Sequence, residues 1–330
     1  MQIHRLIESD MIAGRPVILI PGKIHPRVLE RLTPVFDVLQ TPVGQPVELS
    51  EADAARVRGI AIAGSVPAAL MEKLPNLQVI ANFGVGYDGV DVAAAAKRGV
   101  IVTNTPDVLD DEVADTTIAL LLNTLRQFYA AESYLRAGRW EKEGAFALTP
   151  LSLRGRHVGL YGLGRIGGEI ASRLEPFKVK ISYHTRNPKP GVSYGYQPSL
   201  KALAEAVDTL ICIVPKTAET HKAIDADILK ALGANGVVIN VGRGWSMDEE
   251  ALIAALKDGT IAAAGLDVFY DEPKVPSELL DLPNVSLLPH VASASVHTRN
   301  AMADLVADNL IGWFENGVVK TPVPETPVKA

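Results

Sequence analysis

Six residues near the middle of the chain constrain its fold more than any other feature. The segment Gly162-Leu163-Gly164-Arg165-Ile166-Gly167 follows the apolar run 158–161 and opens a stretch whose apolar residues have helical spacing. Between a strand and a helix, glycines at these places permit a tight turn, a close approach of backbone N–H groups to a pyrophosphate, and close helix packing. The segment therefore predicts a dinucleotide bound at the N-terminus of a helix.

The end of the next predicted strand, 179–183, indicates which dinucleotide is bound. An NAD site would carry Asp or Glu there, because a carboxylate hydrogen-bonds the ribose 2′-hydroxyl. This chain instead has Thr185 and Arg186, with Lys189 nearby. A hydroxyl group and cations suit a 2′-phosphate, so we predict that NADPH is preferred over NADH. The alternative is that Arg186 is only a solvated surface charge.

Length and composition favour a folded chain of two domains. The chain has 330 residues, which is long for one compact core, and 48% of them are hydrophobic. A net charge of −6 without a long basic run gives no electrostatic reason to expect nucleic-acid binding. No stretch approaches the roughly 18 apolar residues of a membrane span, including the N-terminus, where Arg5, Glu8 and Asp10 interrupt the apolar residues.

The cysteine and histidine residues also limit the possible chemistry. Cys212 is the only cysteine, so no intrachain disulfide can form, and its apolar surroundings predict a buried strand residue rather than a nucleophile. The seven histidines show no spacing that is typical of metal ligands, so we expect no metal. These features together predict a cytoplasmic protein.

Strand-like and helix-like stretches alternate along the chain in two series. Alternation of this kind predicts a parallel sheet that is covered by helices on both faces. The expected fold class is therefore α/β, with two doubly wound, Rossmann-like domains. The predicted strands are 16–20, 57–63, 77–82 and 100–103 in the first series, and 158–161, 179–183, 209–214, 237–241, 261–266 and 285–288 in the second.

Two helical patterns suggest how these domains connect. An amphipathic stretch over 110–129 begins with three acidic residues and leads from the first series to the second. A further helix over 295–314 follows the last strand and has no place unless it returns to the first domain. We therefore expect a discontinuous substrate-binding domain, 1–106 with 293–330, a dinucleotide-binding domain over 107–292, and an active site in the cleft between them.

Three residues at the carboxyl ends of strands in the second series form a candidate catalytic set, because open parallel sheets place their chemistry at that edge. Arg243 lies between two glycines, and its guanidinium can hold a carboxylate or polarise a carbonyl. His290 is a candidate proton donor. Glu272 is the candidate carboxylate that keeps the imidazole protonated, although the neighbouring Asp271 is a rival that spacing cannot exclude.

The motifs that contain these residues make the chain resemble the D-2-hydroxyacid dehydrogenase family over almost its whole length. The resemblance rests on the glycine fingerprint, the N-V-G-R-G segment around Arg243, the G-L-D-V-F-x-x-E-P segment ending at Pro273, and the P-H pair that contains His290, in this order. It implies that Arg243, Glu272 and His290 are catalytic, that Asp267 contacts the nicotinamide carboxamide, and that the protein is a homodimer.

The resemblance also implies a substrate-binding loop over 82–88. There the backbone N–H groups of Val85 and Gly86 would grip the substrate carboxylate, and glycines around Val85 allow such a nest of donors. Arg243 would bind the substrate as well. The predicted cofactor-binding residues are Gly162, Leu163, Gly164, Arg165, Ile166, Gly167, Thr185, Arg186, Val214, Pro215, Thr220, Val241 and Asp267.

We therefore expect hydride transfer from NADPH to a small 2-oxo acid, as in the family's glyoxylate and hydroxypyruvate reductases, with phosphorylated acids disfavoured. One alternative is an NADH-linked dehydrogenase of the same family with another substrate. A more distant alternative is a dinucleotide-sensing binding protein that resembles the family's transcriptional co-repressors. Trp245, which is bulkier than the residue many relatives carry after Arg-Gly, leaves the shape of the pocket open.

Overall fold

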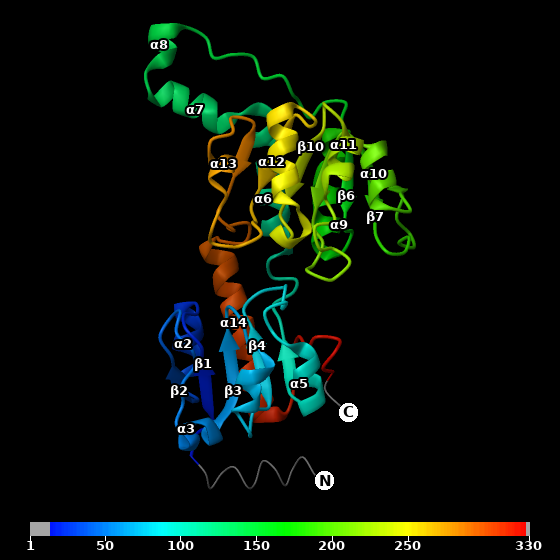
Figure 1. Cartoon of the computed structure of the whole chain (residues 1–330). Coiled ribbons are helices and arrows are strands. Elements are labelled where there is room, and N and C mark those ends of the chain that lie inside the picture. The colour runs from blue at the N-terminus through cyan, green and yellow to red at the C-terminus, as the bar shows by residue number, and fades with distance from the viewer. Residues whose placement is uncertain (1–13, 328–330) are drawn as a thin grey trace. The chain divides into compact units, whose positions relative to one another are not determined.

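The computed structural model describes residues 14–327, which fall into two compact units (Figure 1). Unit 1 contains the described residues up to Leu109 together with those from Ser295 onward, and unit 2 is Asp110–Ala294. Residues 1–13 and 328–330, including Arg5, Glu8 and Asp10 of the sequence analysis, lie outside the described residues.

Unit 1 is built on a five-stranded sheet with the order β2-β1-β3-β4-β5, in which neighbouring strands pair in parallel. Its edge strand β2 was not predicted, because its four residues are at most half-buried and begin with an aspartate. The strands are β1 (Val17–Ile20), β2 (Asp37–Gln40), β3 (Val57–Ile62), β4 (Val79–Asn82) and β5 (Ile101–Thr103).

Helices cover both faces of this sheet. One face packs against α3 (Glu51–Arg56), α4 (Ala68–Glu72) and α5 (Val92–Arg98), and the other against α2 (Pro26–Leu32) and α14 (Val296–Asn316). In Figure 1, α14 runs along the strands of unit 1 although it is the last helix in the chain. Its buried side chains meet residues of β1 and β4, because both α14 and the sheet bury apolar surface by this contact.

Unit 2 is built on a seven-stranded parallel sheet with the order β12-β11-β10-β9-β6-β7-β8. The chain crosses from one half of this sheet to the other between β7 and β9, which lie on opposite sides of β6. The short edge strand β8 was not predicted. The strands are β6 (His157–Tyr161), β7 (Lys180–His184), β8 (Gly195–Tyr196), β9 (Thr209–Cys212), β10 (Val237–Asn240), β11 (Ala263–Leu266) and β12 (Val285–Leu287).

The sheet of unit 2 is also covered on both faces. One core joins it to α6 (Asp110–Arg126) and α9 (Arg165–Leu174), and the other to α10 (Leu200–Ala206), α11 (Ala226–Leu232) and α12 (Glu249–Asp258). Short helices η1 (Glu175–Phe177), η2 (Gly244–Ser246) and α13 (Ser277–Leu280) lie between these elements. The predicted α/β class with two doubly wound, Rossmann-like sheets is confirmed.

The single helix predicted over 110–129 is wrong in extent. Gln127 adopts a left-handed backbone conformation with φ 52°, which ends α6 at Arg126 and starts α7 (Phe128–Arg136) in a new direction. The side chain of Asn123 accepts a hydrogen bond from Tyr129 N at 3.0 Å and so supports this turn. Neither glycine nor proline marks the break, so the sequence carries no local signal for it.

Candidate active site

The glycine fingerprint forms the turn between β6 and α9. Gly162 has φ 102°, and a Cβ atom there would lie 2.8 Å from the Ile213 carbonyl oxygen. A Cβ on Gly167 would lie 2.6 Å from the Gly162 carbonyl oxygen, whereas one on Gly164 would meet no atom within 4 Å. The first N–H groups of α9 have no side-chain cap. The turn therefore offers backbone donors and open space, which fits a dinucleotide pyrophosphate.

The other fingerprint residues have partners inside unit 2. Leu163 is buried, and Ile166 packs against the same core. Arg165 lies 3.7 Å from the Asp110 carboxylate at the start of α6. The side chains of Leu163 and Ile166 pack into the protein, so these two residues would offer a bound pyrophosphate their backbone atoms, whereas the Arg165 side chain is exposed.

The residues that were predicted to select the cofactor lie at the end of β7. Thr185 Oγ1 donates to Asn187 O at 2.6 Å, and Arg186 and Lys189 are exposed. The pKa of Glu219, in the loop after β9, is lowered by hydrogen bonds from its own backbone N–H and from the Thr217 hydroxyl. The charge of Arg186 lowers this pKa further. Arg186 thus faces the loop that follows β9, and no carboxylate occupies the segment 184–189.

The loop after β9 and the end of β10 lie against each other. Thr220 Oγ1 donates to Pro215 O at 2.8 Å and closes this loop. A Cβ on Gly242 would be 2.9 Å from the Val214 carbonyl oxygen, and Val241 N donates to Cys212 O at 3.2 Å. The structure therefore brings Val214, Pro215, Thr220 and Val241 together at the carboxyl edge of the sheet. Burial raises the pKa of the Cys212 thiol, which agrees with its predicted place in a buried strand.

Arg243 follows β10 and is held by its backbone. Asn240 Nδ2 and Ser246 Oγ donate to its carbonyl oxygen at 3.1 and 2.8 Å. At the next position, a Cβ on Gly244 would lie 1.9 Å from the carbonyl carbon of Phe269, so only glycine fits. This close approach places Arg243 beside the segment that carries Glu272.

His290 and Glu272 are joined by a direct hydrogen bond. His290 Nδ1 lies 2.7 Å from Glu272 Oε2, and Glu272 Oε1 accepts from Phe269 N at 3.0 Å. Burial by itself would raise the pKa of Glu272, but the hydrogen bonds from His290 and Phe269 and the charge of Arg243 outweigh it, so its pKa is below the usual value. Glu272 is therefore ionised at neutral pH, and within residues 14–327 the Nε2 atom of His290 has no hydrogen-bond partner.

The rival carboxylate, Asp271, makes no hydrogen bond or ion pair with His290 in the described part of the chain. It is exposed and pairs with Lys274, whose Nζ atom lies 3.3 Å from Asp271 Oδ2. Sequence spacing left Asp271 and Glu272 as equal candidates for the partner of His290, and the contacts favour Glu272.

Asp267 has a structural task that the sequence analysis did not predict. Its two carboxylate oxygens accept from Val291 N at 2.7 Å and Ala292 N at 3.0 Å, and its carbonyl oxygen accepts from His290 N at 2.8 Å. Burial raises the pKa of Asp267 against the opposing effect of these hydrogen bonds. The contacts hold His290 at φ 54°, a left-handed conformation that is uncommon outside glycine. The sequence signal that could have indicated this task is an aspartate directly after the apolar run 261–266.

Trp245 belongs to an aromatic cluster, which we define as His221, Trp245 and Tyr270. The ring centroid of Trp245 lies 4.0 Å from that of His221 and 5.8 Å from that of Tyr270. Trp245 Nε1 donates to Thr217 O at 2.8 Å, and Lys216 Nζ lies 4.6 Å from the indole centroid. Trp245 therefore ties the loop after β9 to the segment before Glu272.

The predicted substrate loop, 82–88, follows β4 in unit 1. Neither Val85 N nor Gly86 N donates a hydrogen bond to another group in the described part of the chain. Phe83 at the start of the loop stacks on His25, and the guanidinium carbon of Arg299 lies 5.7 Å from its ring centroid. The loop thus presents two backbone donors, which is what an anion-binding nest requires.

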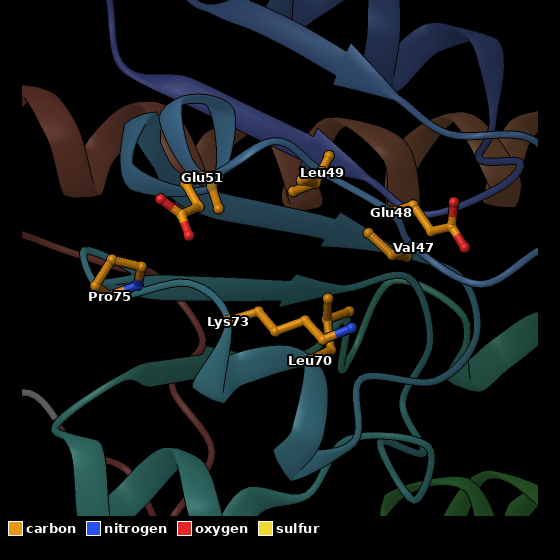
Figure 2. Close-up of a pocket in the computed structure, with 8 residues that line it drawn as sticks. Val47, Glu48, Leu49, Glu51, Leu70, Lys73 and Pro75 are labelled. Atoms are coloured by element: carbon orange, nitrogen blue, oxygen red, sulfur yellow. The ribbon is translucent and has the colours of Figure 1, made fainter.

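A separate hollow in unit 1 carries none of the predicted site residues. It has a volume of about 460 Å³, and Figure 2 shows side chains that line it, including Leu49, Leu70 and Lys73. Across residues 14–327 there is no group of three or more His, Cys, Asp or Glu side chains that could hold a metal ion. No described helix is both long and apolar enough to cross a membrane.

Comparison with known proteins identifies the family. The fold and the glycine turn are those of a dinucleotide-dependent oxidoreductase, and the family model of the D-isomer specific 2-hydroxyacid dehydrogenase NAD-binding domain matches residues 118–292. The chain is 48% identical over 267 residues to glyoxylate/hydroxypyruvate reductase A of Arabidopsis thaliana, covering 81% of this chain and 84% of that protein. The chain belongs to the D-isomer specific 2-hydroxyacid dehydrogenase family, so the predicted family is confirmed.

Other relatives extend the similarity over almost the full length. A crystal structure of NADPH-dependent glyoxylate/hydroxypyruvate reductase from Sinorhizobium meliloti, in complex with NADP and malonate, is 62% identical. It has a TM-score of 0.94, with 96% of this chain and 99% of that chain covered. The 2-ketogluconate reductase of Gluconobacter oxydans is 39% identical over 316 residues, covering 94% of this chain and 100% of that protein.

Proposed function

We propose that the protein is an NADPH-dependent reductase of small 2-oxo acids of the glyoxylate and hydroxypyruvate type. The observation that carries this proposal is the 2.7 Å contact of His290 Nδ1 with an ionised Glu272, which leaves Nε2 available to a substrate. Support also comes from the 62% identity to the Sinorhizobium meliloti reductase that was crystallised with NADP and malonate.

The cofactor preference rests on residues of unit 2. The turn of Gly162, Gly164 and Gly167 would hold the pyrophosphate, and Thr185 and Arg186 would bind the 2′-phosphate, since no carboxylate competes there. When bound, NADPH supplies a hydride for the carbonyl carbon of the substrate. Val214, Pro215, Thr220 and Val241 would line the nucleotide site, and Asp267 would contact the nicotinamide carboxamide in addition to holding the His290 loop.

The catalytic steps follow from three side chains of this chain. Arg243 polarises the substrate carbonyl and offsets the charge that develops on its oxygen. His290 donates its Nε2 proton to that oxygen, so the product is a 2-hydroxy acid. Glu272 stabilises the protonated imidazole and fixes its orientation through Nδ1.

The substrate carboxylate would bind the N–H groups of Val85 and Gly86 and the guanidinium of Arg243. Backbone donors suit a small carboxylate, and the loop 82–88 contains no lysine or arginine that could bind a distal phosphate. Small unphosphorylated acids are therefore the proposed substrates.

Initial rates of the purified protein test this function. Glyoxylate, hydroxypyruvate, pyruvate, 2-ketogluconate and phosphohydroxypyruvate are each offered with NADPH and with NADH. We expect the highest kcat/KM with NADPH and glyoxylate or hydroxypyruvate. Higher kcat/KM with NADH would favour the NADH-linked alternative, and faster reduction of phosphohydroxypyruvate would refute the substrate class. Cofactor binding without turnover of any acid would indicate a dinucleotide-sensing protein.

We further propose a cytoplasmic homodimer with a substrate-binding domain, 1–106 and 293–330, and a dinucleotide-binding domain, 107–292. The two compact units of the structure meet in sequence after Leu109 and after Ala294, a few residues beyond these limits. This division supports the discontinuous arrangement. A single buried cysteine suits a reducing compartment. Helices α7 and α8 (Arg139–Glu143) bury no residue and expose Phe128, Tyr129, Leu135 and Trp140, which supports their contact with a second subunit.

A further inference from the structure

Three consecutive carbonyl groups of the substrate loop, those of Gly84, Val85 and Gly86, are bound by protein donors. Asn82 Nδ2 donates to Gly84 O at 3.1 Å and to Gly86 O at 3.0 Å, and Asn104 Nδ2 donates to Val85 O at 2.8 Å. Gly84 O also accepts from Thr105 N at 3.0 Å. Three consecutive carbonyls are thus fixed by two asparagine side chains, one at the end of β4 and one directly after β5.

This pattern sets the direction of the loop's N–H groups. Within one planar trans peptide unit, the carbonyl of a residue and the N–H of the next residue point in opposite directions. Binding Gly84 O therefore orients Val85 N–H, and binding Val85 O orients Gly86 N–H. These are the two donors that have no acceptor elsewhere in residues 14–327.

Both asparagines are buried, and Asn104 is also bound through its carbonyl oxygen. Asn82 is 4% exposed and Asn104 is 8% exposed. Asn104 O accepts from Thr321 Oγ1 at 2.6 Å, and Thr321 Oγ1 accepts from Asn309 Nδ2 at 2.9 Å. Asn309 is fully buried in α14. A chain of hydrogen bonds therefore connects the loop to the longest helix of unit 1.

We propose that Asn82 and Asn104 are positioning residues that preorganise the amides of Val85 and Gly86 for the carboxylate of a 2-oxo acid. This proposal rests on the proposed function. Preorganised donors bind an anion without first being reoriented, so their benefit is an increase in substrate affinity. Aspartate, although of equal size, cannot serve, because a carboxylate only accepts hydrogen bonds and repels both the loop carbonyls and the substrate anion.

The test uses Asn82→Ala, Asn82→Asp and Asn104→Ala in the full chain. We expect the KM for glyoxylate, and the inhibition constant of oxalate against glyoxylate, to rise about tenfold or more in each variant. The KM for NADPH should stay within about twofold, because the nucleotide residues are on unit 2. Asn76→Asp is the matched control, since Asn76 Nδ2 also donates to a carbonyl, Ala55 O at 2.7 Å, outside the loop.

Two results would overturn the positioning role while leaving the proposed function intact: an unchanged KM for glyoxylate in an active Asn82→Ala and Asn104→Ala pair, or an equal rise of both KM values. Unaltered protein that turns over no 2-oxo acid with NADPH would instead refute the function. Should the variants fail to fold, NMR of unaltered protein decides. The side-chain amide protons of Asn82 and Asn104 should exchange slowly with solvent, and should keep their resonances when oxalate is added to the NADP⁺-bound protein, because their hydrogen bonds to the loop exist before the anion binds. Rapid exchange of these protons without oxalate would reject the positioning role.

Discussion

At the scale of single residues, the chemistry of the proposed site depends on contacts that set charge and orientation. Glu272 is ionised because hydrogen bonds from His290 and Phe269 outweigh the effect of burial. Asp267 uses both carboxylate oxygens to hold the backbone just after His290. Each acidic residue therefore acts on the histidine in a different way, one through its charge and one through the path of the backbone.

The first prediction separates the proton donor from its partner. His290→Gln keeps a polar side chain but cannot donate the proton, so kcat should fall by roughly 100-fold or more while NADPH still binds. Glu272→Gln removes the negative charge that stabilises protonated His290. The active form is then lost at lower pH, so the alkaline limb of the pH profile for reduction should move toward lower pH.

Asp271→Asn is the control for this prediction, because Asp271 pairs with Lys274 and not with His290. Its alkaline limb should coincide with that of unaltered protein. A shift in Asp271→Asn together with none in Glu272→Gln would reverse the assignment of the two carboxylates.

A second residue-scale prediction concerns Arg186. Arg186→Ala removes a charge-assisted contact to the 2′-phosphate, so the KM for NADPH should rise by roughly tenfold to 100-fold, with little change for NADH. Steady-state kinetics with both cofactors measure this. Lys180→Ala, at the exposed start of the same strand, is the control and should change neither KM. Equal effects of Arg186→Ala on NADPH and NADH would rule out a 2′-phosphate contact.

At the scale of elements, the β6–α9 turn depends on a close approach of helix and strand. A Cβ on Gly167 would lie 2.6 Å from the Gly162 carbonyl oxygen, which is backbone and cannot move aside cheaply. The next residue of the same helix, Gly168, has no atom within 4 Å of its Cβ position. Close packing of helix and strand therefore requires glycine at position 167, whereas the space around position 168 would accept a larger residue.

The third prediction compares these two positions. Gly167→Ala should lower the free energy of unfolding by about 1–3 kcal/mol and weaken NADPH binding, because the helix must shift away from the turn. Gly168→Ala should leave NADPH affinity unchanged and raise stability by up to about 1 kcal/mol, since alanine favours helix. Urea unfolding and cofactor titration measure both. Equal stability of the two variants would contradict the proposed close packing.

At the scale of the whole molecule, α7 and α8 differ from the other described elements in having several large apolar side chains in solvent. Tyr129 is 77% exposed and Trp140 is 62% exposed. Exposed apolar groups of this size on one segment are typical of a subunit interface.

The fourth prediction follows from that surface. Light scattering should give twice the 35.2 kDa mass of the chain for unaltered protein. Trp140→Glu places a charge in the proposed interface, so it should give the monomer mass or a strongly concentration-dependent one. Phe177→Glu, at a residue that is 43% exposed outside α7 and α8, should remain dimeric. A monomer mass for unaltered protein would refute the homodimer.

The amino-acid sequence alone determined the features that depend on local spacing. The glycines of the 162–167 turn, the absence of an acid after β7, and the alternation of strands and helices are all visible within short segments, because each reflects a local backbone requirement. They were sufficient for the fold class, and the ordered set of motifs was sufficient for the family, which the relatives confirm.

Which distant residues meet became clear only from the three-dimensional packing. It placed Glu272 rather than Asp271 against His290, turned the chain at Gln127, and brought Asn82 and Asn104 to the same loop. These contacts join side chains that are far apart in sequence, and the turn depends on a backbone angle that the residue type does not predict. Periodicity reports which face of an element is buried, whereas the partner across a contact is fixed by the packing of the complete unit.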